Sequence, residues 1–178
     1  SVGSFGCNLR CGFCQNHAIS QCGAPEQDAM HIGPGELAHK AKQMVPQGNI
    51  GLAFTYNEPA VGYEFVRDAA RAAKALGLAN VMVTNGYFCP AVLDELLPVV
   101  DAFNIDLKCF SEEGYQSLGG TRAAKARHVE VTCLVVPGLS DDEVKMDKMA
   151  AFLAGLSPTL PLHLSRYFPR YRADAPPT

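Results

Sequence analysis

The sequence predicts an α/β fold built on a parallel β-sheet. Three observations support this: six short apolar runs are spread along the chain, helical patterns lie between them, and the connections are short. Strand and helix in repeated succession imply parallel strands with right-handed crossovers. Six such strands would form either an open sheet or a partial barrel.

The six apolar runs are the predicted strands. Most of them are continuously apolar rather than alternating, which is typical of strands that are buried on both faces. They cover residues 1–5, 50–55, 81–84, 102–107, 129–136 and 160–164.

The helical patterns lie between these strands. Residues 59–76 form an amphipathic pattern, because Val61, Phe65 and Ala69 fall on one face. Further helices are expected at 35–45, from Pro90 onward, and after a Ser-Asp-Asp-Glu capping box at 140–143.

The connection between the fourth and fifth predicted strands is irregular. Gly119 and Gly120 interrupt it, so only residues 121–127 remain for a helix. This leaves about two turns at ~3.6 residues per turn. We therefore expect the fourth crossover helix to be short or lost.

Length and charge narrow the class of protein. With 178 residues, 48% of them hydrophobic, the chain suits one domain with a sizeable core. The net charge of −3, without any basic run, offers no electrostatic surface for nucleic acid or an anionic membrane. No apolar stretch approaches the ~20 residues that span a bilayer, and no signal sequence opens the chain. We expect a soluble, cytoplasmic protein without nucleic-acid or membrane partners.

Three of the seven cysteines form a cluster at the start of the chain. Cys7, Cys11 and Cys14 are separated by three and then two residues, on a loop that leaves the first predicted strand. A structural zinc site usually takes four ligands in two separated pairs, and no second Cys-x2-Cys pair follows. Three thiolates on a four-iron cluster would leave one iron open for a substrate. The odd count and the crowding favour a reducing compartment and a metal site over disulfides.

Two alternatives remain open at this point. The cluster could be a zinc knuckle, with Cys22 or His17 as the nearest fourth ligand, or a chance grouping of buried cysteines. The other four cysteines are isolated, and we assign them to core or loop packing. They are Cys22, Cys89, Cys109 and Cys133.

The cysteine pattern, with Phe13 just before the last cysteine, resembles the signature of the radical S-adenosylmethionine (SAM) superfamily. Further matches follow in order at the ends of successive predicted strands. They are Thr-Tyr-Asn-Glu-Pro at 55–59, Val-Thr-Asn-Gly at 83–86, Asn-Ile-Asp-Leu-Lys at 104–108, Val-Val-Pro-Gly at 135–138 and His-Leu-Ser-Arg-Tyr at 163–167. The cysteine loop with Gln-Asn-His at 15–17, Tyr-Asn-Glu-Pro at 56–59 and His-Leu-Ser-Arg at 163–166 are similar to one subgroup. This subgroup is the AmmeMemoRadiSam-system radical SAM enzymes, relatives of pyruvate formate-lyase activating enzyme.

The resemblance implies a partial (β/α)6 TIM-like barrel. Against the family pattern we expect this barrel to be truncated at both ends and its fourth crossover helix to be shortened by about a dozen residues. We expect residues 1–168 to form the radical SAM core domain. Residues 169–178 would form a polar, proline-rich tail that is loosely held.

The resemblance also implies the cofactors and their ligands. Cys7, Cys11 and Cys14 would be both the metal ligands of a [4Fe–4S] cluster and the catalytic residues, and the methionine moiety of SAM would chelate the open iron. Further cofactor-binding residues are expected at the strand ends, where the active site of a parallel α/β barrel lies. They are Phe13, Asn57, Glu58, Thr84, Asn85, Asp106, Lys108, His163 and Arg166.

The resemblance implies a role for seven of these nine residues. Asn57 and Glu58 would accept hydrogen bonds from the methionine amino group. Lys108 would offset the carboxylate or the ribose side, Thr84 and Asp106 would orient the cofactor, and His163 and Arg166 would line the cavity near the sulfonium or the substrate.

Taken singly, some of these residues have simpler explanations. Glu58 could favour a helix N-terminus through the helix dipole. Asn85 and Gly86 form an ordinary turn dipeptide, and Asp106 with Lys108 could be a surface pair.

The predicted function is that of an oxidoreductase. An external one-electron donor of the flavodoxin or ferredoxin type would reduce the cluster, SAM would be cleaved, and a 5′-deoxyadenosyl radical would take hydrogen from a substrate that the sequence does not name. Within this class the alternative is a glycyl-radical-enzyme activase that acts on a partner protein. From a different class, the alternative is a non-catalytic zinc or iron–sulfur module.

Overall fold

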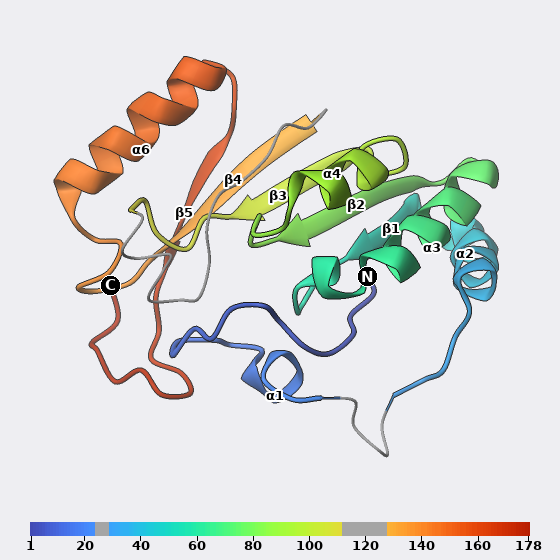
Figure 1. The fold of residues 1–178 in the computed structure, drawn as a ribbon, viewed down its shortest axis with the longest axis horizontal. Helices are drawn as coiled ribbons and strands as arrows, with labels where there is room; N and C mark the ends of the chain where they lie inside the picture. Colours follow the sequence, from blue (N-terminus) through green and yellow to red (C-terminus); the bar gives the residue numbers. More distant parts are fainter. Residues whose placement is uncertain (24–28, 112–127) are drawn as a thin grey trace.

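A computed structural model describes residues 1–23, 29–111 and 128–178. Its centre is a five-stranded parallel sheet whose strands lie side by side in sequence order. They are β1 (Gly51–Phe54), β2 (Ala79–Thr84), β3 (Ala102–Asp106), β4 (His128–Val135) and β5 (Leu162–Arg166). β1 and β5 lie at opposite edges, so the sheet does not close (Figure 1). The predicted α/β fold with a partial barrel is confirmed.

The first predicted strand is reduced to a single bridge. Val2 pairs in parallel with Phe54. The ladder stops there because the amide of Ser4 donates to the side chain of Asn57 (N to Oδ1, 3.0 Å). Gly6, with a φ of +87°, then turns the chain in a conformation that glycine adopts readily. The sheet therefore has five strands where six were predicted.

Helices cover one side of the first three strands (Figure 1). They are α2 (Pro34–Gln43), α3 (Tyr63–Ala75) and α4 (Pro90–Leu96). The pattern predicted at 59–76 divides into the 3-10 helix η2 (Pro59–Gly62) and α3, and α2 is followed by a second 3-10 helix, η1 (Val45–Gln47). The short helix α1 (His17–Ser20) was not predicted.

Helix α6 (Glu143–Leu156) packs on β4. Its N-cap is Asp142, whose side chain accepts from the amide of Lys145 at 2.9 Å. The predicted capping serine, Ser140, instead accepts from the amide of Val136 with its hydroxyl. The shortened fourth crossover helix was predicted within 112–127, outside the described residues.

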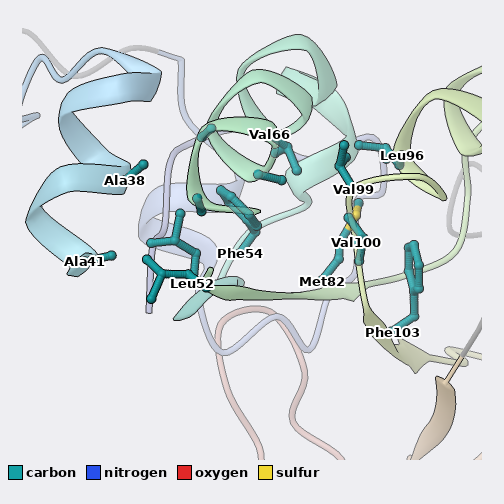
Figure 2. Packing of buried hydrophobic residues seen from close by; sticks show 14 of the residues in the cluster. Ala38, Ala41, Leu52, Phe54, Val66, Met82, Leu96, Val99, Val100 and Phe103 are labelled. Atoms are coloured by element: carbon teal, nitrogen blue, oxygen red, sulfur yellow. The ribbon is translucent and has the colours of Figure 1, made fainter. Parts of the chain in front are cut away.

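The main core fills the space between the sheet and α2, α3 and α4 (Figure 2). Strand side chains on this face alternate with those on the opposite face, so only every second residue enters the core. The buried strand residues are Leu52, Phe54, Met82 and Phe103, and Val66 and Leu96 meet them from the helices.

A second cluster seats the cysteine loop, residues 7–14. Leu9 and Phe13 pack with Val136, which follows β4, and with Tyr167, which follows β5. All four side chains are buried. The loop is therefore fixed to the ends of the last two strands by apolar contacts.

The C-terminal segment, residues 169–178, contacts the cysteine loop and α1. The amide of Arg172 donates to the carbonyl of Gly12 at 2.9 Å. The ring of Tyr171 stacks on His17 with centroids 4.4 Å apart. In Figure 1 the blue N-terminal and red C-terminal segments both run below the sheet, on the side away from α4.

Two of the four isolated cysteines are buried, as a packing role requires, and two are not. All seven cysteines are free thiols; Cys109 and Cys133 are buried, whereas Cys22 and Cys89 are exposed in loops. Within the described ranges, no helix has the length and apolar character that crossing a membrane requires.

Met82 tests the main core. Its side chain is 0% exposed, so Met82→Ala should lower the free energy of unfolding by ~2–5 kcal/mol through lost burial and a residual cavity. Ile50→Ala is the control, because Ile50 is 81% exposed and should change stability by no more than ~0.5 kcal/mol. Urea denaturation followed by circular dichroism measures both, and equal effects would contradict the assigned core.

Candidate functional site

A cavity of about 340 Å³ lies where the cysteine loop meets the carboxyl ends of the strands. This volume is in the ~300–1,000 Å³ range of ligand pockets. With the exception of His163, all the predicted site residues line it. They are Cys7, Cys11, Phe13, Cys14, Asn57, Glu58, Thr84, Asn85, Asp106, Lys108 and Arg166. The fold therefore brings together residues that are spread over most of the chain.

The three cysteines share this cavity without already forming a metal site. Cys11 is buried, and Cys7 and Cys14 are half-buried. Across the described parts of the chain, no three histidine, cysteine or acidic side chains are close enough to hold a metal ion. A four-iron cluster takes its cysteine ligands on different irons, so the three thiols need not meet at one ion to bind it.

The environment of Cys7 and Cys11 favours the protonated form of both thiols. Burial raises the pKa of Cys7, and it raises the pKa of Cys11 to about 11. The ammonium group of Lys108 acts in the opposite direction on both thiols. Because metals bind thiolates, loading a metal here would release protons.

Asn57 holds the segment that precedes Cys7. Its side-chain oxygen accepts from the amide of Ser4 at 3.0 Å. Its side-chain nitrogen donates to the hydroxyl of Ser4 at 2.9 Å and to the carbonyl of Gly6 at 3.0 Å. In this structure the amide group of Asn57 thus fixes the cysteine loop to the end of β1.

A pair of asparagines, Asn8 and Asn85, fixes Cys7 to the end of β2. Asn85 Nδ2 donates to Asn8 Oδ1 at 2.8 Å and lies 3.7 Å from the sulfur of Cys7. Asn8 Nδ2 donates to the carbonyl of Tyr87, and the amide of Tyr87 donates to Asn85 Oδ1 at 2.8 Å. The turn after β2 is therefore part of the support of the cysteine loop.

Glu58 is a buried carboxylate with three donors. It is 2% exposed. Oε1 accepts from the amide of Ala60 at 2.9 Å and from the hydroxyl of Thr84 at 2.7 Å, and Oε2 accepts from the amide of Asn85 at 2.7 Å. Burial raises the pKa of this carboxyl group, and the three donors oppose that shift. Glu58 also caps η2, so its helix-capping role is confirmed.

Asp106 and Lys108 form an ion pair on the cavity wall, with 2.8 Å between Oδ2 and Nζ. Burial by itself would lower the pKa of Lys108, but the Asp106 carboxylate raises it, and the net change is a rise. The pair is therefore a feature of the cavity rather than of the outer surface alone.

The prediction that His163 lines the cavity is wrong. His163 and Ser165 lie on the same face of β5 because side chains alternate along a strand, yet only Ser165 reaches the cavity. The ring of His163 bonds Glu130 instead, with 2.9 Å between Nε2 and Oε2. His163 lies one step further from the carboxyl end of β5, beside Thr132.

Sequence reasoning missed several residues of the site, among them Asn8, Ser20, Tyr56 and Ser165. Tyr56 has a φ of +76°, a left-handed conformation that is uncommon for a residue other than glycine. It stands where the Gly-Gly-Glu-Pro-like segment would carry glycine, and that mismatch was the available signal. Ser20 carries no such signal, because its place in the site depends on the turn of α1.

Comparisons with known proteins agree with this arrangement. The sequence model of the Radical SAM superfamily matches residues 1–150. The "Uncharacterized protein MJ0808" of Methanocaldococcus jannaschii is 37% identical over 97% of this chain and 54% of its own length. Pyruvate formate-lyase 1-activating enzyme of Escherichia coli is 30% identical over 83% of this chain and 65% of its own length. The chain thus spans roughly half to two thirds of these relatives.

Solved structures show the same fold at low identity. SuiB of Streptococcus suis, in a crystal structure described as bound to precursor peptide SuiA, superimposes with a TM-score of 0.55 at 13% identity. The match covers 83% of this chain and 35% of SuiB.

Glu58→Gln tests the buried carboxylate in the protein without ligand. The new amide nitrogen cannot accept, and because donors face both carboxylate oxygens, either orientation leaves a buried donor unpaired. The free energy of unfolding should fall by ~1–3 kcal/mol. Glu64→Gln, on the exposed side of α3, should stay within ~0.5 kcal/mol. A Glu58→Gln variant as stable as the unmodified chain would show that these hydrogen bonds do not hold the ends of β1 and β2 together.

Proposed function

Because this chain belongs to the radical SAM superfamily, we propose that it is the catalytic part of an enzyme that cleaves SAM reductively. Members of this superfamily bind a [4Fe–4S] cluster and SAM. The observation that carries the proposal is this cavity, because it combines three cysteines of one loop with a carboxylate and a cation at the strand ends.

The donor set fits an iron–sulfur cluster. Such clusters take cysteine thiolates as ligands, and Cys7, Cys11 and Cys14 all line the cavity. These three residues would hold the cluster and leave one iron for SAM. When bound and reduced, the cluster supplies the electron that breaks the C5′–S bond of SAM.

The other cavity residues would bind and orient SAM. A carboxylate offers about four acceptor sites, so Glu58 keeps one for the methionine amino group beyond its three donors. Lys108 would face the SAM carboxylate as a cation. Leu9, Phe13 and Leu134 form apolar parts of the wall and would exclude water.

A non-catalytic zinc module has less support. It needs a fourth protein ligand, and neither candidate belongs to the cavity lining. The ring of His17 stacks on Tyr171, and its Nδ1 lies 3.2 Å from the carbonyl of Cys14. The thiol of Cys22 is exposed and donates to the carbonyl of Ile19.

Within the enzyme class we propose a glycyl-radical activase as the more specific function. The identity to pyruvate formate-lyase 1-activating enzyme favours it, as does the Asp106–Lys108 element of the cavity. Such an enzyme takes electrons from a flavodoxin or ferredoxin and acts on a partner protein. Incubation with pyruvate formate-lyase, SAM and reductant, followed by electron paramagnetic resonance, should then reveal a glycyl radical. Without that signal, SAM cleavage alone would point to another substrate.

Replacing Cys7, Cys11 or Cys14 with alanine should abolish both cluster binding and SAM cleavage, because each supplies one of three protein bonds to the cluster. Cys89→Ala is the matched control, since this thiol is exposed and outside the cavity. After anaerobic reconstitution, bound iron and sulfide and the yield of 5′-deoxyadenosine are measured. Full cluster content in Cys11→Ala would overturn the ligand assignment, and one zinc per chain without iron would favour the zinc module.

Glu58→Gln should also weaken SAM binding about tenfold or more, because a charge-assisted hydrogen bond is worth ~1.5–3 kcal/mol. Thr84→Val is the matched control: it removes one donor to the same carboxylate but keeps the charge. Titration of SAM against both reconstituted variants compares them. Equal loss of affinity in the two variants would mean that loop support, rather than the charge, accounts for the effect.

A further inference from the structure

Ser20 has a buried hydroxyl beside Cys14. The residue is 2% exposed, and its Oγ lies 3.0 Å from the sulfur of Cys14. The single turn of α1 creates this contact, because the amide of Ser20 donates to the carbonyl of Asn16 at 2.9 Å and so brings residue 20 back toward residue 14. The proposed function does not yet use this hydroxyl.

The direction of this hydrogen bond is decided by the state of Cys14. Between a thiol and a hydroxyl, either group could donate. A cysteine bound to iron is a thiolate and has no proton to give. In the loaded protein the Ser20 hydroxyl is then the donor and the Cys14 sulfur is the acceptor.

The contact is short in comparison with the other donors to the cysteine sulfurs. Cys7 accepts from the amide of Leu9 at 3.3 Å and from Asn85 Nδ2 at 3.7 Å. A serine kept only for packing would bury its hydroxyl at a cost that alanine avoids. What the Ser20 hydroxyl adds at this position is a hydrogen bond to the sulfur of Cys14.

We propose that Ser20 is a positioning residue whose hydroxyl donates to the Cys14 thiolate and raises the reduction potential of the [4Fe–4S] cluster. This inference rests on the proposed function. In the half-reaction the oxidised cluster takes up one electron from the external donor, and no bond is formed or broken. The added negative charge is shared with the sulfur ligands, so a donor to sulfur stabilises the reduced form more than the oxidised form.

The test is a redox titration of the anaerobically reconstituted chain with dithionite, followed by electron paramagnetic resonance. Ser20→Ala should keep its cluster content. At a fixed applied potential the ratio of reduced to oxidised cluster should fall about tenfold, which corresponds to ~59 mV for a one-electron couple.

Two further comparisons separate the hydroxyl from general packing. Ser20→Thr and Ser20→Val have similar volumes and differ by the hydroxyl, so only the valine variant should show the lower potential. Ser140→Ala removes another buried hydroxyl, which is 5% exposed and bonds Val136 and Leu134 instead of a cysteine. It should lower stability and leave the potential unchanged.

The outcomes distinguish the inference from the proposed function. Equal potentials in the threonine and valine variants, with full cluster content, would overturn the role of Ser20 and leave the enzyme assignment standing. If Ser20→Ala does not assemble, the threonine and valine pair decides. If the unmodified chain takes up no iron and sulfide, the proposed function fails, and this inference fails with it.

Discussion

The buried carboxylate of Glu58 is the constraint on which the arrangement of the site depends. A carboxylate placed in a protein interior is stable only where donors surround it. Here the donors come from the turn after β1 and from the turn after β2, so one side chain ties two strand ends together. The same turn after β2 then holds Asn8 through Asn85, and with it the first cysteine. Loss of the carboxylate would thus weaken the support of the cysteine loop as well as the link between the two strand ends.

Much of the fold could be predicted because its signals are local. Buried parallel strands are short apolar runs, and β1 to β5 each overlap a predicted one. The prediction of the first strand was wrong because the amide of Ser4, which a β-ladder would use, donates to the side chain of Asn57 instead. The cap of α6 moved from Ser140 to Asp142 for a similar reason, since the hydroxyl of Ser140 has a partner in the loop after β4.

The sequence predicted which residues belong to the site better than it predicted the contacts that these residues make. Strand ends meet at one edge of a parallel sheet, which is why residues as distant as Asn57 and Arg166 line one cavity. Pattern alone could not show which side chains are already engaged. His163 is turned to Glu130, and the amide group of Asn57 is occupied by Ser4 and Gly6, just before the cysteine loop. Such pairings depend on contacts between different helices, strands and loops, and the spacing of residues along the sequence cannot predict these contacts.

The contact between Gly12 and Arg172 has a consequence for the order of assembly. It joins segments from near the two ends of the chain, so forming it closes a very long loop, and contacts of this kind form late in folding. A chain that emerges amino end first exposes its cysteines long before residue 172 is made. The cysteine loop therefore gains this contact only after translation has passed residue 172, so its three thiols are synthesised well before this part of their surroundings.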